Sequence, residues 1–239
     1  MVYASDGLRV VGFVVLPAAP GPHPVIIYLR GGNRDFGRIE AATLLNLAWL
    51  ADHGFVVLAT QYRGADGGEG ADQFGGDDVN DVLALVPLAR SLAQADLSRL
   101  HVLGGSRGAM EGLIAIRRGL PARAAAFRGG VYDLAATLQL RPDLGQVWGE
   151  LIPGFATDRA GVLAQRSAVG WAGDIRIPTL LLHGRQDWRS PLADAEAFAA
   201  ALAAAGTSHK LVVYEDEEHQ LALHREAWLG EVVAWFKRP

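Results

Sequence analysis

The chain has 239 residues, of which 50% are hydrophobic and 20% charged, and its formal net charge at pH 7 is −4. These are ordinary values for a globular protein, and the length suits a single α/β domain of about 200–250 residues. No basic stripe is present to hold phosphates, so nucleic acid is not expected as a partner. The absence of cysteine excludes disulfides, thiolate nucleophiles and cysteine-based zinc sites.

The first residues and the hydropathy pattern favour a soluble cytoplasmic protein. Residues Met1–Gly7 lack the charged start and apolar run of a signal peptide. No stretch of about 18 uncharged apolar residues suggests a membrane span. We therefore expect residues 1–239 to form one domain with no membrane partner.

Short apolar runs alternate with longer helical patterns along the chain. This alternation is typical of βαβ units and predicts a mostly parallel central sheet flanked by helices. The first run, Leu8–Leu16, is the candidate for an antiparallel edge strand. The predicted strands are Leu8–Leu16, Val25–Leu29, Phe55–Ala59, Leu100–Leu103, Ala124–Phe127, Thr179–Leu182 and Lys210–Tyr214.

Apolar residues at helical spacing predict helices between these strands. Pro87 falls inside one of the patterns, so we expect a kink there or two shorter pieces. The predicted helices are Ile39–Asp52, Asp77–Leu92, Ser106–Arg118, Leu192–Ala205 and Ala222–Phe236.

Residues 132–174 interrupt the alternation of strands and helices. Bulky apolar side chains, Trp148 and Trp171 among them, lie there between Pro and Gly residues with no clean strand pattern. Two interpretations remain open. The segment is either a short lid-like insertion that walls a pocket over the strand ends, or a set of packed helices with no role in substrate choice.

Residues Gly104–Gly108 read Gly-Gly-Ser-Arg-Gly and match the G-x-S-x-G nucleophile elbow of α/β hydrolases. In that motif a serine on a tight strand-to-helix turn projects its hydroxyl from the top of the sheet, and the flanking glycines relieve crowding. A predicted strand precedes Ser106 and a predicted helix follows it. The alternative is a glycine-rich turn in which Ser106 merely caps a helix.

A serine hydroxyl needs an adjacent base, and in this fold the order along the chain is Ser, then Asp or Glu, then His. Of the four histidines after Ser106, His219 lies on a loop that follows a predicted strand. The other three fit less well, because His209 precedes a strand, His183 precedes the best acid candidate, and His224 is expected inside the last helix. His219 is therefore the predicted general base, the alternative being a solvated histidine beside an acidic run.

Asp187 is the predicted acid of the triad. It follows a predicted strand and a glycine turn, which places it on the loop next to that of His219. Its expected role is to orient the imidazole and stabilise the imidazolium. Asp187 could alternatively cap the following helix, and Asp216 is a weaker rival acid because it lies so close to His219 in sequence.

Acyl transfer also needs hydrogen-bond donors aimed at the developing oxyanion. The expected donors are the backbone N–H groups of Arg107, which follows the nucleophile, and Gly32, in the glycine-rich loop after Val25–Leu29. Asn33 lies close by and is a candidate for substrate binding. A set of arginines could meet a substrate carboxylate or could simply be solvated: Arg30, Arg34 and Arg63.

Four stretches resemble the catalytic domain of the prolyl oligopeptidase family of serine peptidases (family S9): Tyr62–Gly68, Gly75–Val82, Pro178–Asp187 and Tyr214–His219. The resemblance implies an α/β-hydrolase fold and places Ser106, Asp187 and His219 in the triad. The chain departs from the family pattern in three ways. Only 24 residues precede Val25 in this sequence, so no β-propeller is expected there. Arg30 stands where relatives often have His or Tyr, and no Glu-Glu element for gripping a peptide amino terminus is evident.

The predicted function is that of a serine hydrolase that cleaves carboxylic esters through an acyl-enzyme. The alternative is a compact acylaminoacyl- or dipeptidyl-type peptidase, so the expected partner is a small ester or a short peptide. A hypothesis of a different class is a non-enzymatic binding domain, which would be expected to lack a triad member. The chemistry requires no metal and no organic cofactor.

Overall fold

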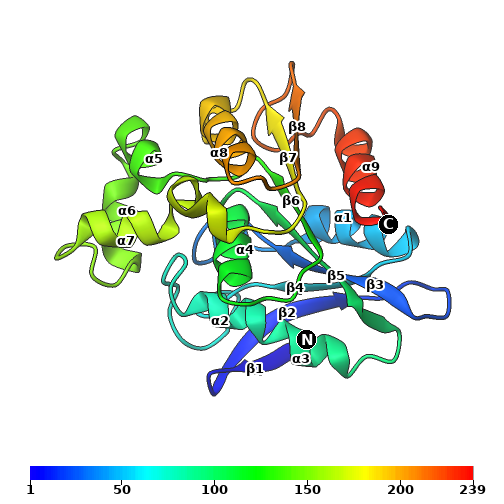
Figure 1. The fold of residues 1–239 in the computed structure, drawn as a ribbon. Helices are drawn as coiled ribbons and strands as arrows, with labels where there is room; N and C mark the ends of the chain where they lie inside the picture. Colours follow the sequence, from blue (N-terminus) through cyan, green and yellow to red (C-terminus); the bar gives the residue numbers. More distant parts are fainter. Residues whose placement is uncertain (239) are drawn as a thin grey trace.

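A computed structural model describes residues 1–238 and contains an eight-stranded sheet in the order β1-β2-β4-β3-β5-β6-β7-β8 (Figure 1). Strands β3 to β8 pair in parallel, whereas β2 pairs antiparallel with both β1 and β4. The predicted, mostly parallel sheet is therefore confirmed. The strands are β1 Val2–Ser5, β2 Leu8–Val15, β3 His23–Leu29, β4 Val56–Thr60, β5 Ala95–Gly105, β6 Ala124–Arg128, β7 Thr179–Gly184 and β8 His209–Tyr214.

The edge of the sheet differs from the prediction. Leu8–Leu16 was expected at the edge, but β2 lies inside the sheet and the short strand β1 forms the edge beyond it. Asp6 and Gly7 connect β1 to β2 with φ values of 50° and 79°, the left-handed conformation that a two-residue hairpin turn requires. This Asp-Gly pair is the sequence signal that predicts the missing strand.

Helices cover both faces of the sheet (Figure 1). Helices α1 and α9 pack on one face, and α2, α3, α4 and α8 pack on the other. Helices α5, α6 and α7 and the short 3₁₀ helix η1 follow β6 and precede β7. The helices are α1 Ala41–Asp52, α2 Asp78–Leu83, α3 Leu85–Arg90, α4 Arg107–Arg117, α5 Leu134–Leu140, α6 Leu144–Leu151, α7 Arg159–Arg166, η1 Ala168–Asp174, α8 Leu192–Ala204 and α9 Arg225–Phe236.

The structure shows the two shorter pieces expected around Pro87, and it corrects the start of the last helix. The pattern over Asp77–Leu92 forms two pieces that meet at Ala84, because Pro87 has no N–H to donate to the carbonyl of Leu83. The last helix begins at Arg225, so His224 precedes it and does not lie inside it.

Among residues 1–238, no helix has both the length and the apolar character that a membrane crossing requires.

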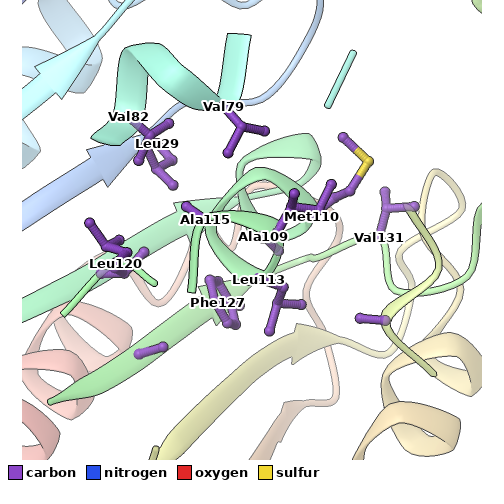
Figure 2. Packing of buried hydrophobic residues seen from close by; sticks show 14 of the residues in the cluster. Leu29, Val79, Val82, Ala109, Met110, Leu113, Ala115, Leu120, Phe127 and Val131 are labelled. Atoms are coloured by element: carbon purple, nitrogen blue, oxygen red, sulfur yellow. The ribbon is translucent and has the colours of Figure 1, made fainter. Parts of the chain in front are cut away.

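The hydrophobic core has two halves, one on each face of the sheet, because successive side chains of a strand point to opposite faces. Figure 2 shows part of the half beneath α4, where Leu113 lies near Phe127 of β6 and Leu29 of β3 lies beside Val82 of α2. Every residue of α4 from Arg107 to Ala115 is buried. The start of this helix, which follows Ser106 directly, is therefore held firmly by the core.

Candidate active site

Ser106 occupies a strained turn between β5 and α4, with φ 55° and ψ −122°. The turn is so tight that a Cβ on Gly104 would lie 2.4 Å from the carbonyl oxygen of Gly108, and a Cβ on Gly108 would lie 2.1 Å from that of Leu29. Only glycine fits at these two positions. Because positive φ is uncommon for residues other than glycine, the surrounding packing must hold Ser106 in this conformation.

His219 and Asp187 form a buried hydrogen-bonded pair on the loops that follow β8 and β7. The distance from His219 Nδ1 to Asp187 Oδ2 is 2.8 Å. The other carboxylate oxygen, Oδ1, accepts the backbone N–H groups of Arg189 and Ser190, each at 2.9 Å. These two strands are parallel neighbours, so their carboxyl ends bring the two loops together.

The charge state of Asp187 fixes the tautomer of His219. Burial alone would raise the pKa of Asp187, but the hydrogen bond from His219 and the backbone N–H of Ser190 hold that pKa below its usual value. Asp187 is thus a carboxylate at neutral pH and can only accept, so His219 Nδ1 carries the proton. The second nitrogen, Nε2, is left as an acceptor and can act as a base.

The other histidines do not join Ser106. His183 is buried behind the pair, where its Nε2 contacts the carbonyl oxygen of Ser190 at 2.7 Å and lies 3.5 Å from Asp187 Oδ2. His209 Nδ1 contacts the carbonyl oxygen of Thr207, before β8.

Asp216, the rival acid, does not contact His219. One of its oxygens lies 3.6 Å from His224 Nε2 instead. His224 itself is held by Glu217, whose Oε1 accepts the His224 backbone N–H at 2.6 Å. Of the acids considered from the sequence, Asp187 is the one that meets the imidazole.

Ser106 and His219 line one cavity of about 530 Å³, and Asp187 lies behind His219. No hydrogen bond joins the Ser106 hydroxyl to the imidazole within residues 1–238. Side chains of the segment 132–174 form one wall of this cavity, among them Thr137, Leu144, Val147 and Trp148.

The glycine-rich loop after β3 closely approaches the nucleophile. A Cβ on Gly31 would lie 2.9 Å from the Cβ of Ser106. Arg30 Nη1 donates to the carbonyl oxygen of Gly31 at 3.0 Å. Because C=O and N–H point in opposite directions across a trans peptide, this contact turns the Gly32 N–H away from the Arg30 side chain. Asn33 also lines the cavity.

Arg30, a candidate for substrate binding, is already bound by other groups of the protein. The Arg30 side chain is 1% exposed, and its guanidinium donates to the backbone carbonyls of Gly31, Arg34, Phe36 and Gln61. A buried guanidinium needs such partners, so Arg30 supports the loop and has little capacity left for a substrate.

Arg63 and Arg34 are also engaged by other residues. Arg63 is paired with Asp81 and Asp6, and it does not line the cavity. Arg34 forms an exposed ion pair with Glu150 at 2.8 Å. Neither guanidinium is brought to Ser106 by the fold.

Sequence reasoning missed several residues that line the cavity. Six arginines contribute to its wall, whereas Asp143 is its one acidic residue among those described. The missed residues are Arg128, Arg141, Arg189 and Trp188. For Arg128 the available signal was its place directly after a predicted strand, at the sheet edge where α/β folds carry their sites.

Comparison with known families matches residues 41–239 to the prolyl oligopeptidase family. The chain belongs to the prolyl oligopeptidase family. It is 34% identical over 186 residues to the uncharacterized peptidase YtmA of Bacillus subtilis (strain 168), covering 77% of this chain and 71% of YtmA. The predicted family and hydrolase class are therefore confirmed.

More distant members of the prolyl oligopeptidase family are considerably longer than this chain. An acylamino-acid-releasing enzyme of Arabidopsis thaliana is 29% identical, with 90% of this chain and 30% of that protein covered. The solved Pyrococcus horikoshii acylaminoacyl peptidase superposes with a TM-score of 0.85 at 20% identity, covering 100% of this chain and 41% of that one. The α/β-hydrolase fold is thus confirmed, and the name of the Arabidopsis thaliana relative favours the predicted peptidase alternative over the esterase.

Proposed function

We propose that this prolyl oligopeptidase family member is a serine peptidase that releases N-acylated amino acids from short peptides. Ser106 is the nucleophile, His219 the general base and Asp187 the orienting acid. The observation that carries this proposal is the 2.8 Å bond between His219 Nδ1 and Asp187 Oδ2 beside the strained turn of Ser106. A binding domain without catalysis would have no need of this arrangement.

The reaction begins when His219 Nε2 takes the proton of the Ser106 hydroxyl as its oxygen attacks the substrate carbonyl carbon. Such hydroxyl–imidazole bonds often tighten only once substrate is bound. The backbone N–H groups of Arg107 and Gly32 stabilise the negative oxygen of the tetrahedral intermediate. His219 then protonates the leaving nitrogen, the C–N bond breaks, and water hydrolyses the acyl-enzyme by the same steps.

The cavity favours a blocked amino terminus over a free one. A free terminus carries a positive charge, and three wall arginines without an acid partner among the described residues would repel it: Arg30, Arg128 and Arg189. The acidic residue of the wall, Asp143, is already paired with Arg141 at 2.9 Å. An uncharged N-acyl group avoids this repulsion. The names of the acylamino-acid-releasing enzyme and the acylaminoacyl peptidase point the same way.

The apolar part of the wall suits the side chain of the released residue. Leu144, Val147 and Trp148 come from the segment 132–174, and Phe74 lies against Trp148 with ring centroids 5.6 Å apart. Burying an aromatic or aliphatic side chain against such a surface is favourable by about 1.5–3 kcal/mol. The segment 132–174 is therefore proposed as a pocket wall that selects the substrate.

Turnover of three chromogenic substrates tests the proposal: acetyl-alanyl p-nitroanilide, alanyl-alanyl p-nitroanilide with a free amine, and p-nitrophenyl butyrate. We expect the acetylated anilide to be cleaved with a higher kcat/KM than the free-amine anilide. Ser106→Ala should abolish both activities, and a fluorophosphonate probe should label Ser106. Turnover of the butyrate ester with no cleavage of either anilide would instead support an esterase.

A further inference from the structure

We propose that Arg128 and Tyr28 form an anion-binding subsite that accepts the free carboxylate of the leaving amino acid. This inference rests on the proposed function and names its substrates as N-acylated dipeptides. Both residues line the cavity that holds Ser106 and His219. They lie at the carboxyl ends of β6 and β3, the two strands on either side of β5.

Arg128 lies between the nucleophile and the base. Its carbonyl oxygen accepts the backbone N–H of Ser106 at 2.9 Å. Its Nη1 donates to the carbonyl oxygens of His219 and Gln220, at 3.2 and 2.5 Å. A Cβ on Gly105 would lie 3.2 Å from Nη2, so this second nitrogen lies beside the residue that precedes the nucleophile. The guanidinium is thus held in place by Nη1, and its Nη2 lies beside Gly105, which lines the same cavity.

That other edge of Arg128 has no partner within residues 1–238. Neither Nε nor Nη2 makes a hydrogen bond, and no carboxylate lies within ion-pair distance of the guanidinium. The nearest aromatic face is that of Trp228, 5.3 Å from the guanidinium carbon. Burial lowers the pKa of Arg128, which is the cost of a charge that lacks an anion. A bound carboxylate would offset this cost.

Most other arginines of the wall are already satisfied. Arg107 has three carboxylate partners, Arg38 pairs with Glu40, and Arg30 binds backbone carbonyls. Arg189 has no acid partner, but its guanidinium lies over the exposed Trp188 ring, at 5.1 Å. Arg128 therefore differs from the others in combining partial burial, a fixed orientation and a free hydrogen-bonding edge.

Tyr28 supplies the second donor of the subsite. Its hydroxyl makes no hydrogen bond to the described part of the chain. Burial raises the pKa of Tyr28, and the charges of Arg128 and Arg30 partly offset that rise, so the phenol lies within the field of Arg128. A neutral hydroxyl beside a guanidinium can donate to the same carboxylate that the guanidinium binds.

The position of Arg128 indicates which part of the substrate it meets. The leaving nitrogen must lie next to the imidazole that protonates it. Arg128 is bonded to the backbone of His219 and Gln220, so its free edge lies on the leaving-group side of Ser106. When the C–N bond breaks, the leaving amino acid takes the proton from His219 and departs with its carboxylate.

Two matched substrates test the subsite: acetyl-phenylalanyl-glycine, which has a free carboxylate, and acetyl-phenylalanyl-glycinamide, which has none. We expect kcat/KM of the acid to exceed that of the amide about tenfold or more, as for a charge-assisted hydrogen bond. Arg128→Met should bring this ratio close to one, and Tyr28→Phe should lower it severalfold. Arg141→Met, which removes another charge from the same wall, should leave the ratio within about threefold.

The test compares the acid-to-amide ratio of kcat/KM, which is measured within each variant. A general loss of activity in Arg128→Met lowers both values and leaves this ratio unaffected. Arg128→Lys serves as a second variant that keeps the charge, and it should retain part of the preference for the acid. An acid-to-amide ratio that is unchanged in Arg128→Met, or that falls equally in Arg141→Met, would overturn the subsite.

Calorimetric binding to the Ser106→Ala protein separates the subsite from the proposed function. We expect the acid peptide to bind about tenfold more tightly than the amide, and the difference to vanish in Ser106→Ala/Arg128→Met. If wild type cleaves neither peptide but this difference is seen, the subsite stands and the peptidase function fails. Equal binding of the two peptides would overturn the subsite, and it would leave the proposed peptidase function unaffected.

Discussion

Arg107 Nη1 donates a hydrogen bond at 3.1 Å to the carbonyl oxygen of Gly32, 75 residues away in the chain. One residue thus links the start of α4, next to Ser106, to the glycine-rich loop. The same guanidinium is buried, and it is paired with Asp72, Asp78 and Glu111. The two proposed oxyanion donors, the N–H groups of Arg107 and Gly32, are therefore held relative to one another by the Arg107 side chain.

Arg107→Met should destabilise the fold strongly. It leaves the carboxylates of Asp72 and Asp78 buried without their cation, and breaking a buried ion pair in this way costs about 3–5 kcal/mol. Urea unfolding measures the loss. Arg117→Met on the same helix is the matched control, because the exposed pair of Arg117 with Asp174 is worth at most about 1 kcal/mol. Equal losses in the two variants would contradict this role of Arg107.

The same cluster predicts a pH effect on stability. Burial, followed by repulsion from Asp78, raises the pKa of Glu111 from 4.5 to about 8, even though Arg107 lowers it. The folded protein therefore keeps a proton that the unfolded chain releases, and the associated stability is lost as the pH rises from about 4.5 to 8. Glu111→Gln should remove this loss, which amounts to roughly a few kcal/mol at most. Urea unfolding of wild type and Glu111→Gln at pH 5, 6.5 and 8 measures the difference. If the unfolding free energies of the two proteins changed with pH in parallel, Glu111 would not be the cause.

The parts of the molecule that were predictable from sequence are those in which the signal is local. Strands buried on both faces read as continuous apolar runs, as in Val25–Leu29. The turn around Ser106 requires glycines at fixed spacing. The loop positions of Asp187 and His219 follow from the strands before them. These features need no knowledge of distant partners.

The surroundings of the candidate arginines depend in part on partners far away in the chain. Arg63 is engaged by Asp6, 57 residues away, and Arg30 by the carbonyl of Gln61, 31 residues away. Nothing adjacent to either arginine indicates these contacts. Arg128 was overlooked for a related reason, because its Nη1 donates to the carbonyl oxygen of His219, 91 residues away.

Gly31→Ala should impair activity far more than stability. The new methyl group would lie 2.9 Å from the Cβ of Ser106, so the loop must move away from the nucleophile. Loss of one oxyanion donor costs about 10²–10³ in kcat, which is the expected effect. Steady-state kinetics with thermal unfolding measures both quantities. Gly173→Ala is the control, because its Cβ would meet no atom within 4 Å, and comparable kinetics in the two variants would contradict the close approach.

Asp187→Asn should lower kcat by about 10³–10⁴ with little change in KM. The amide can still accept the backbone N–H groups of Arg189 and Ser190 through Oδ1. Its nitrogen, however, would donate toward His219 Nδ1 and stabilise the tautomer in which Nε2 carries the proton and cannot act as a base. Asp216→Asn is the matched control and should keep wild-type kcat. A similar loss of kcat in Asp216→Asn would show that Asp187 is not the specific acid of the triad.

His101 predicts a second pH effect, of opposite sign and at lower pH. Its ring is buried, stacks on Phe236 with centroids 4.5 Å apart, and has no hydrogen-bond partner at either nitrogen within the described chain. Burial lowers the pKa of His101 from 6.5 to about 4, so the unfolded chain binds a proton that the folded protein excludes. The associated stability, at most about 3 kcal/mol, is present above pH 6.5 and is lost as the pH falls toward 4. His101→Phe keeps the stacking and removes the titration, so the drop in unfolding free energy between pH 7 and pH 4.5 should be smaller in this variant than in wild type. Comparing the two proteins at both pH values cancels any packing effect of the larger ring, and identical drops would show that His101 does not cause the acid sensitivity.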